Sequence, residues 1–80
     1  MSKPEYKLKI KELKNILKSL TAIKGLDLVK VKNQVNQTYG RKDSIHNLRR
    51  KLNEEKLQVS EMLEILDILG YEVIIREEKS

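Results

Sequence analysis

Apolar side chains recur at spacings of three and four residues in four separate stretches of this sequence, which is the period of an amphipathic α-helix. In the first stretch, from Ile10 to Ile23, lysines occupy positions between the apolar residues. Gly25 and Gly70 follow the first and last stretches, at positions where glycine commonly ends a helix. We therefore expect a mainly α-helical fold with four helices, over residues 9–24, 27–37, 43–53 and 60–69.

A different pattern, typical of a β-strand, occurs near each end of the chain. Residues 71–76 are rich in β-branched and aromatic side chains and predict a short C-terminal strand, followed by a polar tail over residues 77–80. Residues 6–10 alternate apolar and charged side chains, so the N-terminal lead over residues 1–8 could also contribute a short strand. A lone strand leaves its backbone N–H and C=O groups without partners. The C-terminal strand must therefore pair either with residues 6–10 or with its equivalent in a second chain.

The predicted last helix favours the second chain, because apolar side chains cover most of its circumference. A chain of 80 residues forms a single domain, residues 1–80, with a thin core, and it has little else with which to cover them. We therefore expect a homodimer with two-fold symmetry. Its interface is predicted to contain Met62, Ile65, Leu69, Tyr71, Val73 and Ile75.

The residue types that most catalytic and metal sites need are scarce. The sequence has no cysteine, which excludes disulfides, thiolate zinc sites and cysteine nucleophiles, and its one histidine excludes a multi-histidine site. That histidine, His46, lies two residues from Ser44 on a different face of the same predicted helix, so the two form no nucleophile–base pair. We expect no enzyme activity, no cofactor and no metal. With neither a membrane-spanning segment nor a signal peptide in the sequence, we expect a cytoplasmic protein with no membrane partner.

The charges are distributed unevenly along the chain. Residues 1–53 contain 14 basic and 4 acidic side chains, a net charge of +10. Residues 54–80 contain 3 basic and 8 acidic side chains, a net charge of −5. A basic front with an acidic back favours an oriented encounter with a polyanion, for which nucleic acid and an anionic membrane surface are the candidates. The membrane ranks last, because the apolar face of the first predicted helix is needed for the core and the sequence has no tryptophan or phenylalanine. A lysine-rich solvated surface without any partner would have the same composition, so composition alone does not decide between the two.

The predicted helix over residues 43–53 concentrates side chains that suit DNA. Asparagine pairs with adenine and arginine with guanine through two hydrogen bonds each, and serine and histidine bond several base-edge groups. One side of this helix supplies the candidate base contacts, which are Ser44, His46, Asn47 and Arg50. Basic side chains in and around it are candidate phosphate contacts, namely Arg41, Lys42, Arg49 and Lys51. Each residue taken alone could equally be a solvated surface residue, and their gathering on one side is what favours DNA binding.

Three runs follow one another along the chain, namely Gly25-Leu26-Asp27, Asn47-Leu48-Arg49-Arg50-Lys51-Leu52 and Leu69-Gly70-Tyr71-Glu72. With the helices around them they resemble the lambda-repressor-like (Cro/XRE-type) helix-turn-helix proteins of phages and bacteria, over about residues 10–76. The resemblance implies a small transcriptional regulator, such as a repressor, that binds double-stranded DNA as a homodimer. It also implies that the helix over 27–37 crosses the DNA backbone and that the helix over 43–53 enters the major groove.

Two features depart from the pattern of that family. Lys32 stands early in the second helix, where the family usually has a small residue, often alanine. The predicted turn over residues 36–42 is also longer than the usual turn of about three or four residues. These departures motivate an alternative function, in which the same scaffold binds an acidic protein surface, as a phage-encoded inhibitor or an antitoxin-like partner would.

Overall fold

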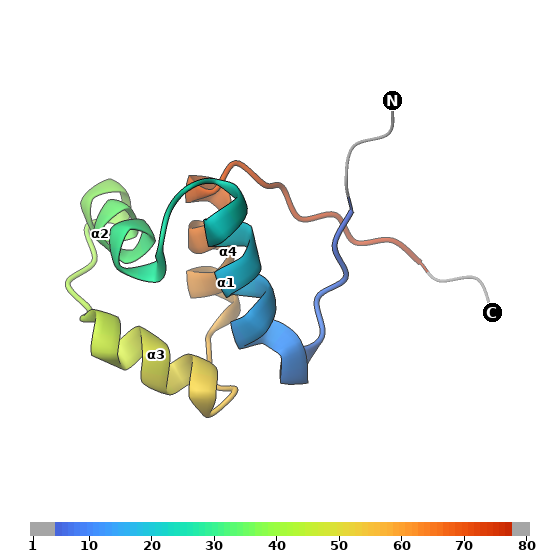
Figure 1. Cartoon of the computed structure of the whole chain (residues 1–80), viewed down its shortest axis with the longest axis horizontal. Helices are drawn as coiled ribbons and strands as arrows, with labels where there is room; N and C mark the ends of the chain where they lie inside the picture. The colour runs from blue at the N-terminus through green and yellow to red at the C-terminus, as the bar shows by residue number, and fades with distance from the viewer. Residues whose placement is uncertain (1–4, 78–80) are drawn as a thin grey trace.

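Four α-helices and one short 3-10 helix make up the part of the chain that the computed structural model describes, residues 5–77 (Figure 1). In chain order they are η1 (Ile10–Glu12), α1 (Leu13–Ile23), α2 (Leu28–Tyr39), α3 (Ile45–Asn53) and α4 (Val59–Ile68). The prediction of a mainly helical fold with four helices is confirmed. Among the described residues, no helix combines the length and the apolar character that crossing a membrane requires.

The core lies between the four helices, and each helix contributes one apolar stripe to it. Helix α2 is central, because it packs against α1, α3 and α4. The buried apolar side chains are Leu17, Leu20, Leu28, Val31, Val35, Leu48, Leu52, Ile65, Leu66 and Leu69. Two of these, Ile65 and Leu69, were predicted at a dimer interface, but they are only 2% and 3% exposed. The chain's own helices enclose them, so neither is available to a second chain in this structure.

The connection between α2 and α3 lies later in the chain than the turn predicted over residues 36–42, because α2 continues to Tyr39 and residues 40–44 separate the two helices. Gly40 ends α2 in the left-handed conformation, with φ of 67°, which costs glycine little and other residues more. The backbone N–H of Arg41 then bonds to the carbonyl of Asn36 at 3.1 Å and satisfies one of the last carbonyls of the helix. Helix α3 begins after Ser44, whose Oγ accepts the backbone N–H of Asn47 at 3.2 Å.

The predicted C-terminal strand over residues 71–76 is not confirmed. No residue between 5 and 77 is in a strand, and within that range residues 72–77 form no backbone hydrogen bond. Nor do residues 6–10 pair with them. The ring of Tyr6 meets that of Tyr71 edge to face at 5.9 Å, while Glu5 lies 3.6 Å from Arg76. Glu5 and Tyr6 are adjacent, but the residues that they contact, Arg76 and Tyr71, lie five positions apart. Paired strands bring adjacent residues of one strand opposite adjacent residues of the other, so the two segments cross without pairing.

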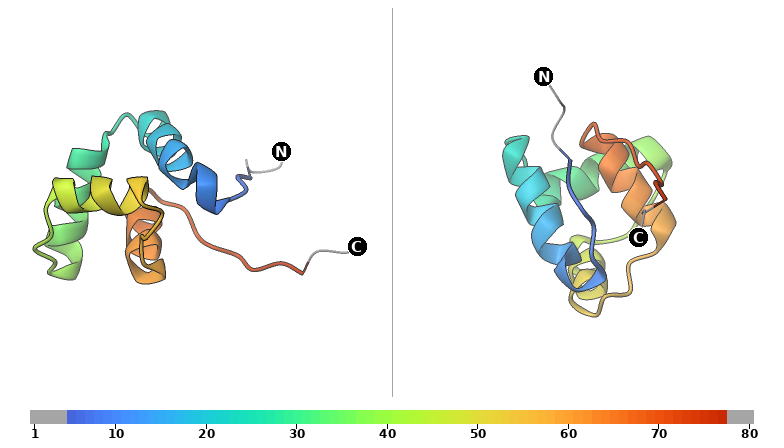
Figure 2. Two further views of the ribbon diagram at one scale, coloured as in Figure 1. Left: turned by 90° about the horizontal axis from the view of Figure 1, so that it is seen from below. Right: turned by 90° about the vertical axis from the view of Figure 1, so that its right-hand side faces the viewer.

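The two ends of the described chain project from the helical body on the same side, away from α2 (Figures 1 and 2). We call residues 5–9 the N-terminal segment and residues 71–77 the C-terminal segment. Three apolar side chains in the C-terminal segment remain open to solvent, since Val73, Ile74 and Ile75 are 47%, 74% and 97% exposed. A strand needs a neighbour to satisfy its ladder, and this segment has none within the described chain. Pairing with a second chain therefore stays a prediction.

Candidate nucleic-acid interface

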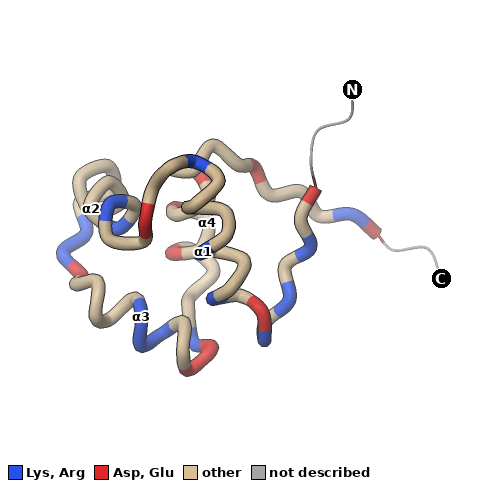
Figure 3. The backbone as a smooth tube through the Cα atoms, in the orientation of Figure 1, with Lys and Arg blue, Asp and Glu red and all other residues tan. Residues whose placement is uncertain are grey.

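Helix α3 has one side in the core and the other in solvent. Leu48 and Leu52 are buried at 1% and 2% exposure, whereas His46, Asn47, Arg49 and Arg50 are exposed. The backbone view shows the basic positions of α3 and of the turn before it along one edge of the molecule (Figure 3). Of the predicted base contacts, His46, Asn47 and Arg50 thus all lie on the solvent side of a helix whose opposite side is anchored.

Ser44, one of the predicted base contacts, has a structural role in the described chain. It is exposed, and its Oγ accepts the Asn47 backbone N–H as the N-cap of α3. Because a hydroxyl both accepts and donates, its hydrogen remains available to an acceptor outside the chain. The positive end of the helix dipole lies at this same end of α3, beside the exposed side chain of Lys42. The start of α3 is therefore suited to an anionic group.

Arg50 is held only loosely by its neighbour along the chain. Its Nε lies 3.8 Å from Oε2 of Glu54, and both side chains are well exposed. Exposed pairs of this kind contribute little free energy, so the guanidinium can leave Glu54 for another partner. The structure thus keeps Arg50 available, as the predicted base contact requires.

Two predicted phosphate contacts, Arg41 and Lys51, form ion pairs with carboxylates of the same chain instead. The guanidinium of Arg41 donates to both carboxylate oxygens of Glu64, from Nε at 2.7 Å and from Nη2 at 2.5 Å. The Nζ of Lys51 lies 2.8 Å from Oε1 of Glu61, a carboxylate that is almost entirely buried. A buried carboxylate is costly unless a cation and hydrogen bonds accompany it, so these two basic residues serve the packing of α4. The other two predicted phosphate contacts, Lys42 and Arg49, remain exposed.

The contact between Arg41 and Glu64 changes the titration of that carboxyl. Hydrogen bonds from the guanidinium, together with its charge, hold the pKa of Glu64 below its ordinary value of 4.5, although partial burial acts in the opposite direction. A second polar contact lies nearby, where the Tyr39 hydroxyl donates to the Asp67 carboxylate, and this raises the pKa of the phenol above 10. Both contacts join the end of α2 and the turn after it to α4.

Sequence reasoning missed a set of charges beneath α3, which we call the buried charge cluster: Lys32, Asp43, Lys51 and Glu61. Lys32 is only 3% exposed, and its Nζ lies 3.8 Å from Oδ2 of Asp43. The same Asp43 oxygen lies 4.0 Å from Nζ of Lys51, which continues to Glu61. A signal was present in the sequence. Lys32 occupies a position of the core-facing stripe 28, 31, 32 and 35, and Glu61 precedes Ile65 by one turn on the buried face of α4.

The turn between α2 and α3 is also tied to α2 by an amide. Asn36 Nδ2 donates to the backbone carbonyl of Asp43 at 2.9 Å. Its Oδ1 is buried and accepts no hydrogen bond within the described residues. Arg41 therefore fixes the beginning of the turn to α4, and Asn36 fixes its end to α2. These contacts constrain the start of α3 in addition to the Ser44 cap.

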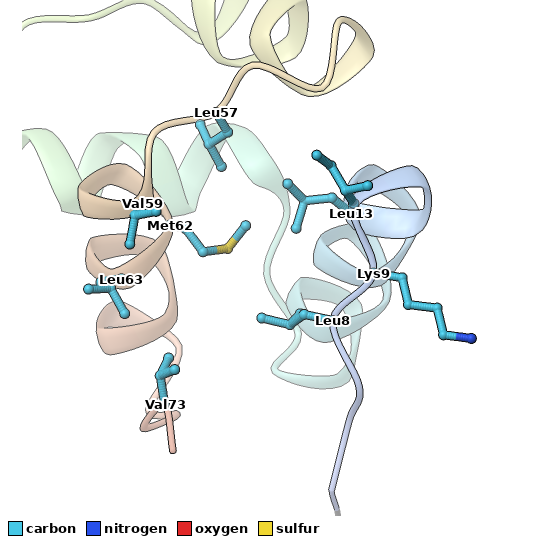
Figure 4. A pocket seen from close by; sticks show the side chains of 9 residues that line it. Leu8, Lys9, Leu13, Leu57, Val59, Met62, Leu63 and Val73 are labelled. Atoms are coloured by element: carbon cyan, nitrogen blue, oxygen red, sulfur yellow. The ribbon is translucent and has the colours of Figure 1, made fainter. Parts of the chain in front are cut away.

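A cleft on another part of the molecule is lined mainly by apolar side chains that are not fully buried in the core. It measures about 290 Å³ and lies between the N-terminal segment, η1, α4 and the C-terminal segment. The side chains of Leu8, Met62 and Val73 line it, whereas that of Lys9 points away (Figure 4). Met62 and Val73 are two of the predicted dimer contacts. Of the others, Tyr71 is half-buried, with Lys24 Nζ 4.9 Å from its ring centre, and Ile75 is almost fully exposed.

Comparison with known proteins gives no support for any particular family: no protein-family model matches the sequence, and no curated protein or solved structure matches the chain.

Proposed function

We propose that the protein binds double-stranded DNA sequence-specifically, as a small transcriptional regulator of the lambda-repressor-like type, with α2 and α3 acting as its helix-turn-helix. The observation that carries the proposal is the division of α3 into two sides. Its outer side bears Asn47 and Arg50, while its inner side is anchored by Leu48 and Leu52. A rigidly held helix that presents such side chains is what reading a base sequence requires.

The dimensions and chemistry of α3 suit the major groove. An α-helix with its side chains is about 10–12 Å across, and the groove is about 12 Å wide. In the proposed complex, Asn47 and Arg50 contact base edges, and Ser44 donates from the helix start. Lys42 and Arg49 contact the flanking phosphates and set the register of the helix. The positive end of the α3 dipole then faces phosphate rather than solvent.

We further propose that two chains associate through the side that carries the C-terminal segment. Val73, Ile74 and Ile75 are exposed there in succession, and their backbone forms no hydrogen bond with any residue between 5 and 77. An unpaired extended segment of this kind readily pairs with a second one. Of the predicted interface residues, Met62, Tyr71, Val73 and Ile75 remain for this contact. Because that side faces away from α2, a two-fold axis there leaves both copies of α3 free for the two halves of a palindromic site (Figure 1).

Sedimentation velocity over a range of protein concentrations tests the association. We expect the wild type to sediment as a dimer and Ile75→Glu to sediment as a monomer. Ile23→Glu is the matched control, since Ile23 is 58% exposed on α1, and we expect it to remain dimeric. A wild type that stays monomeric throughout, or two variants that behave alike, would contradict the proposed interface.

Fluorescence anisotropy tests DNA binding, with fragments of the gene's own promoter as the probe and random duplex as the competitor across a salt series. A specific regulator should prefer one fragment by about 10³-fold or more and show a steep salt dependence. Arg50→Ala and Asn47→Ala should each lose about 1–3 kcal/mol of binding free energy and relax the preference at single base pairs. Lys42→Ala should weaken all duplexes alike and reduce the salt slope by about one.

Lys7→Ala is the matched control for the basic variants, because Lys7 is exposed in the N-terminal segment, which projects away from α2 (Figure 2). We expect it to bind like the wild type apart from a small electrostatic loss. If every duplex binds equally weakly and the Arg50 and Asn47 variants change nothing, the proposal is wrong. The basic side of the molecule would then be tested against acidic protein surfaces, as the alternative function requires.

A further inference from the structure

The buried charge cluster lies beneath α3, the proposed DNA-recognition helix, rather than on its outer side. Lys32 belongs to α2, Asp43 to the turn before α3, Lys51 to the last turn of α3 and Glu61 to the first turn of α4. Two of its members are almost completely enclosed, since Lys32 is 3% and Glu61 5% exposed. These two cannot be explained as ordinary solvated surface charges, whereas the side chains of Lys51 and Asp43 are 25% and 40% exposed.

The cluster alternates in sign and has no net charge. Lys32 Nζ lies 3.8 Å from Asp43 Oδ2, that oxygen lies 4.0 Å from Lys51 Nζ, and Lys51 Nζ lies 2.8 Å from Glu61 Oε1. Each cation thus has an anion beside it, and each anion a cation. Such compensation makes burial tolerable, but buried ion pairs seldom stabilise a protein more than apolar side chains of the same volume would. Stability alone is therefore a poor explanation for charges at core-facing positions.

The geometry of the cluster suggests a different role, because it joins α3 to both of the helices beside it, α2 and α4. Asp43, directly before the N-cap, links the start of α3 to Lys32 of α2. Lys51, in the final turn, links the end of α3 to Glu61 of α4. Apolar packing through Leu48 and Leu52 holds α3 against the core but has little directional preference. The hydrogen-bonded ion pair between Lys51 and Glu61 is directional, and the longer contact between Lys32 and Asp43 adds electrostatic attraction toward α2.

We propose that Lys32 and Glu61 are positioning residues of the DNA interface: they fix the orientation of α3 through Asp43 and Lys51, without contacting DNA themselves. This inference rests on the proposed function, since it concerns the same helix.

Lys32→Met is the decisive variant, because methionine has a similar length and no charge. Asp43 keeps Lys51 and solvent as partners, so no charge is stranded in the core. We expect the melting temperature to be retained or raised. The preference for the specific duplex over random duplex should nevertheless fall by about tenfold or more, comparable to the loss of one good base contact. Lys7→Met, which removes the same charge from the exposed N-terminal segment, should leave that preference within about twofold of the wild type.

Residual dipolar couplings of the backbone amides measure the orientation of α3 relative to α2 without any DNA. In Lys32→Met we expect a change of about 10° or more, the tolerance within which binding sites must be held. An unchanged orientation together with an unchanged DNA preference would overturn the proposal, and so would a lower preference with α3 in its original place.

Glu61→Gln keeps the proposal testable if the methionine variant fails to fold. The amide preserves the shape of the side chain but removes the charge that holds Lys51, which is 25% exposed and can turn to solvent. We expect the end of α3 to reorient and the DNA preference to fall, with a folded far-UV spectrum. If the wild type itself prefers no duplex, the proposed function fails, while the couplings still decide whether the cluster orients α3.

Discussion

Replacing Leu48 by alanine tests whether α3 is anchored to the core. The proposed DNA contacts require this anchoring, because they need a rigid outer side of the helix. Leu48 is 1% exposed and belongs to the hydrophobic core cluster. The substitution removes the last three carbons of the side chain, worth about 0.8 kcal/mol each on transfer from water. The unfilled cavity adds to this, so we expect a loss of about 3–4 kcal/mol. A chain of 80 residues has a total stability of about 4–12 kcal/mol, so the loss is a large fraction of it.

Urea denaturation followed by circular dichroism measures this loss, and the melting temperature should fall by about 4–8 °C for each kcal/mol. Ile23→Ala is the control, because Ile23 is 58% exposed on α1 and its truncation should cost less than about 1 kcal/mol. If Leu48→Ala costs no more than the control, α3 does not pack as the structure describes. Asn47 and Arg50 would then not lie on a rigid outer face.

Three further predictions concern the contacts around α3. Arg41 holds the pKa of Glu64 below 4.5, so the Glu64 carboxylate stabilises the fold above about pH 4.5. This stabilisation is lost as the pH falls through the pKa of Glu64 in the folded protein. Glu64→Gln should therefore make the free energy of unfolding depend less steeply on pH in the acid range. Gly40→Ala should cost about 1 kcal/mol in urea denaturation, from the left-handed backbone alone, since no atom lies within 4 Å of the added carbon; an unchanged midpoint would contradict the left-handed turn. Ser44→Ala should cost about 1 kcal/mol and increase hydrogen exchange in the first turn of α3, whereas equal exchange would show that the cap is not formed.

Much of the local structure could be predicted from the sequence, because helices depend on nearby residues. Apolar spacing located all four helices. A turn was predicted around Gly40, and this glycine adopts the left-handed conformation, although α2 runs to Tyr39 rather than to residue 37. The exposure of His46, Asn47 and Arg50 follows from their places opposite the apolar stripe of α3. These properties depend on the helix period and on backbone conformations that a few neighbouring residues decide, so they required no knowledge of which helices touch.

Only the tertiary structure decided which of several similar side chains are available to a partner. Arg41 and Lys51 resemble Lys42 and Arg49 in the sequence, yet Glu64 and Glu61, which α4 brings alongside, engage the first two. Which helices pack together also decides the burial of Ile65, Leu69 and Lys32. Residues 71–76 form no strand within the described chain, because no other segment of it lies alongside them in register. The physical reason is the same in each case: ion pairs, burial and strand ladders need a second group from a distant part of the chain or from another chain, and only folding or association brings that group close.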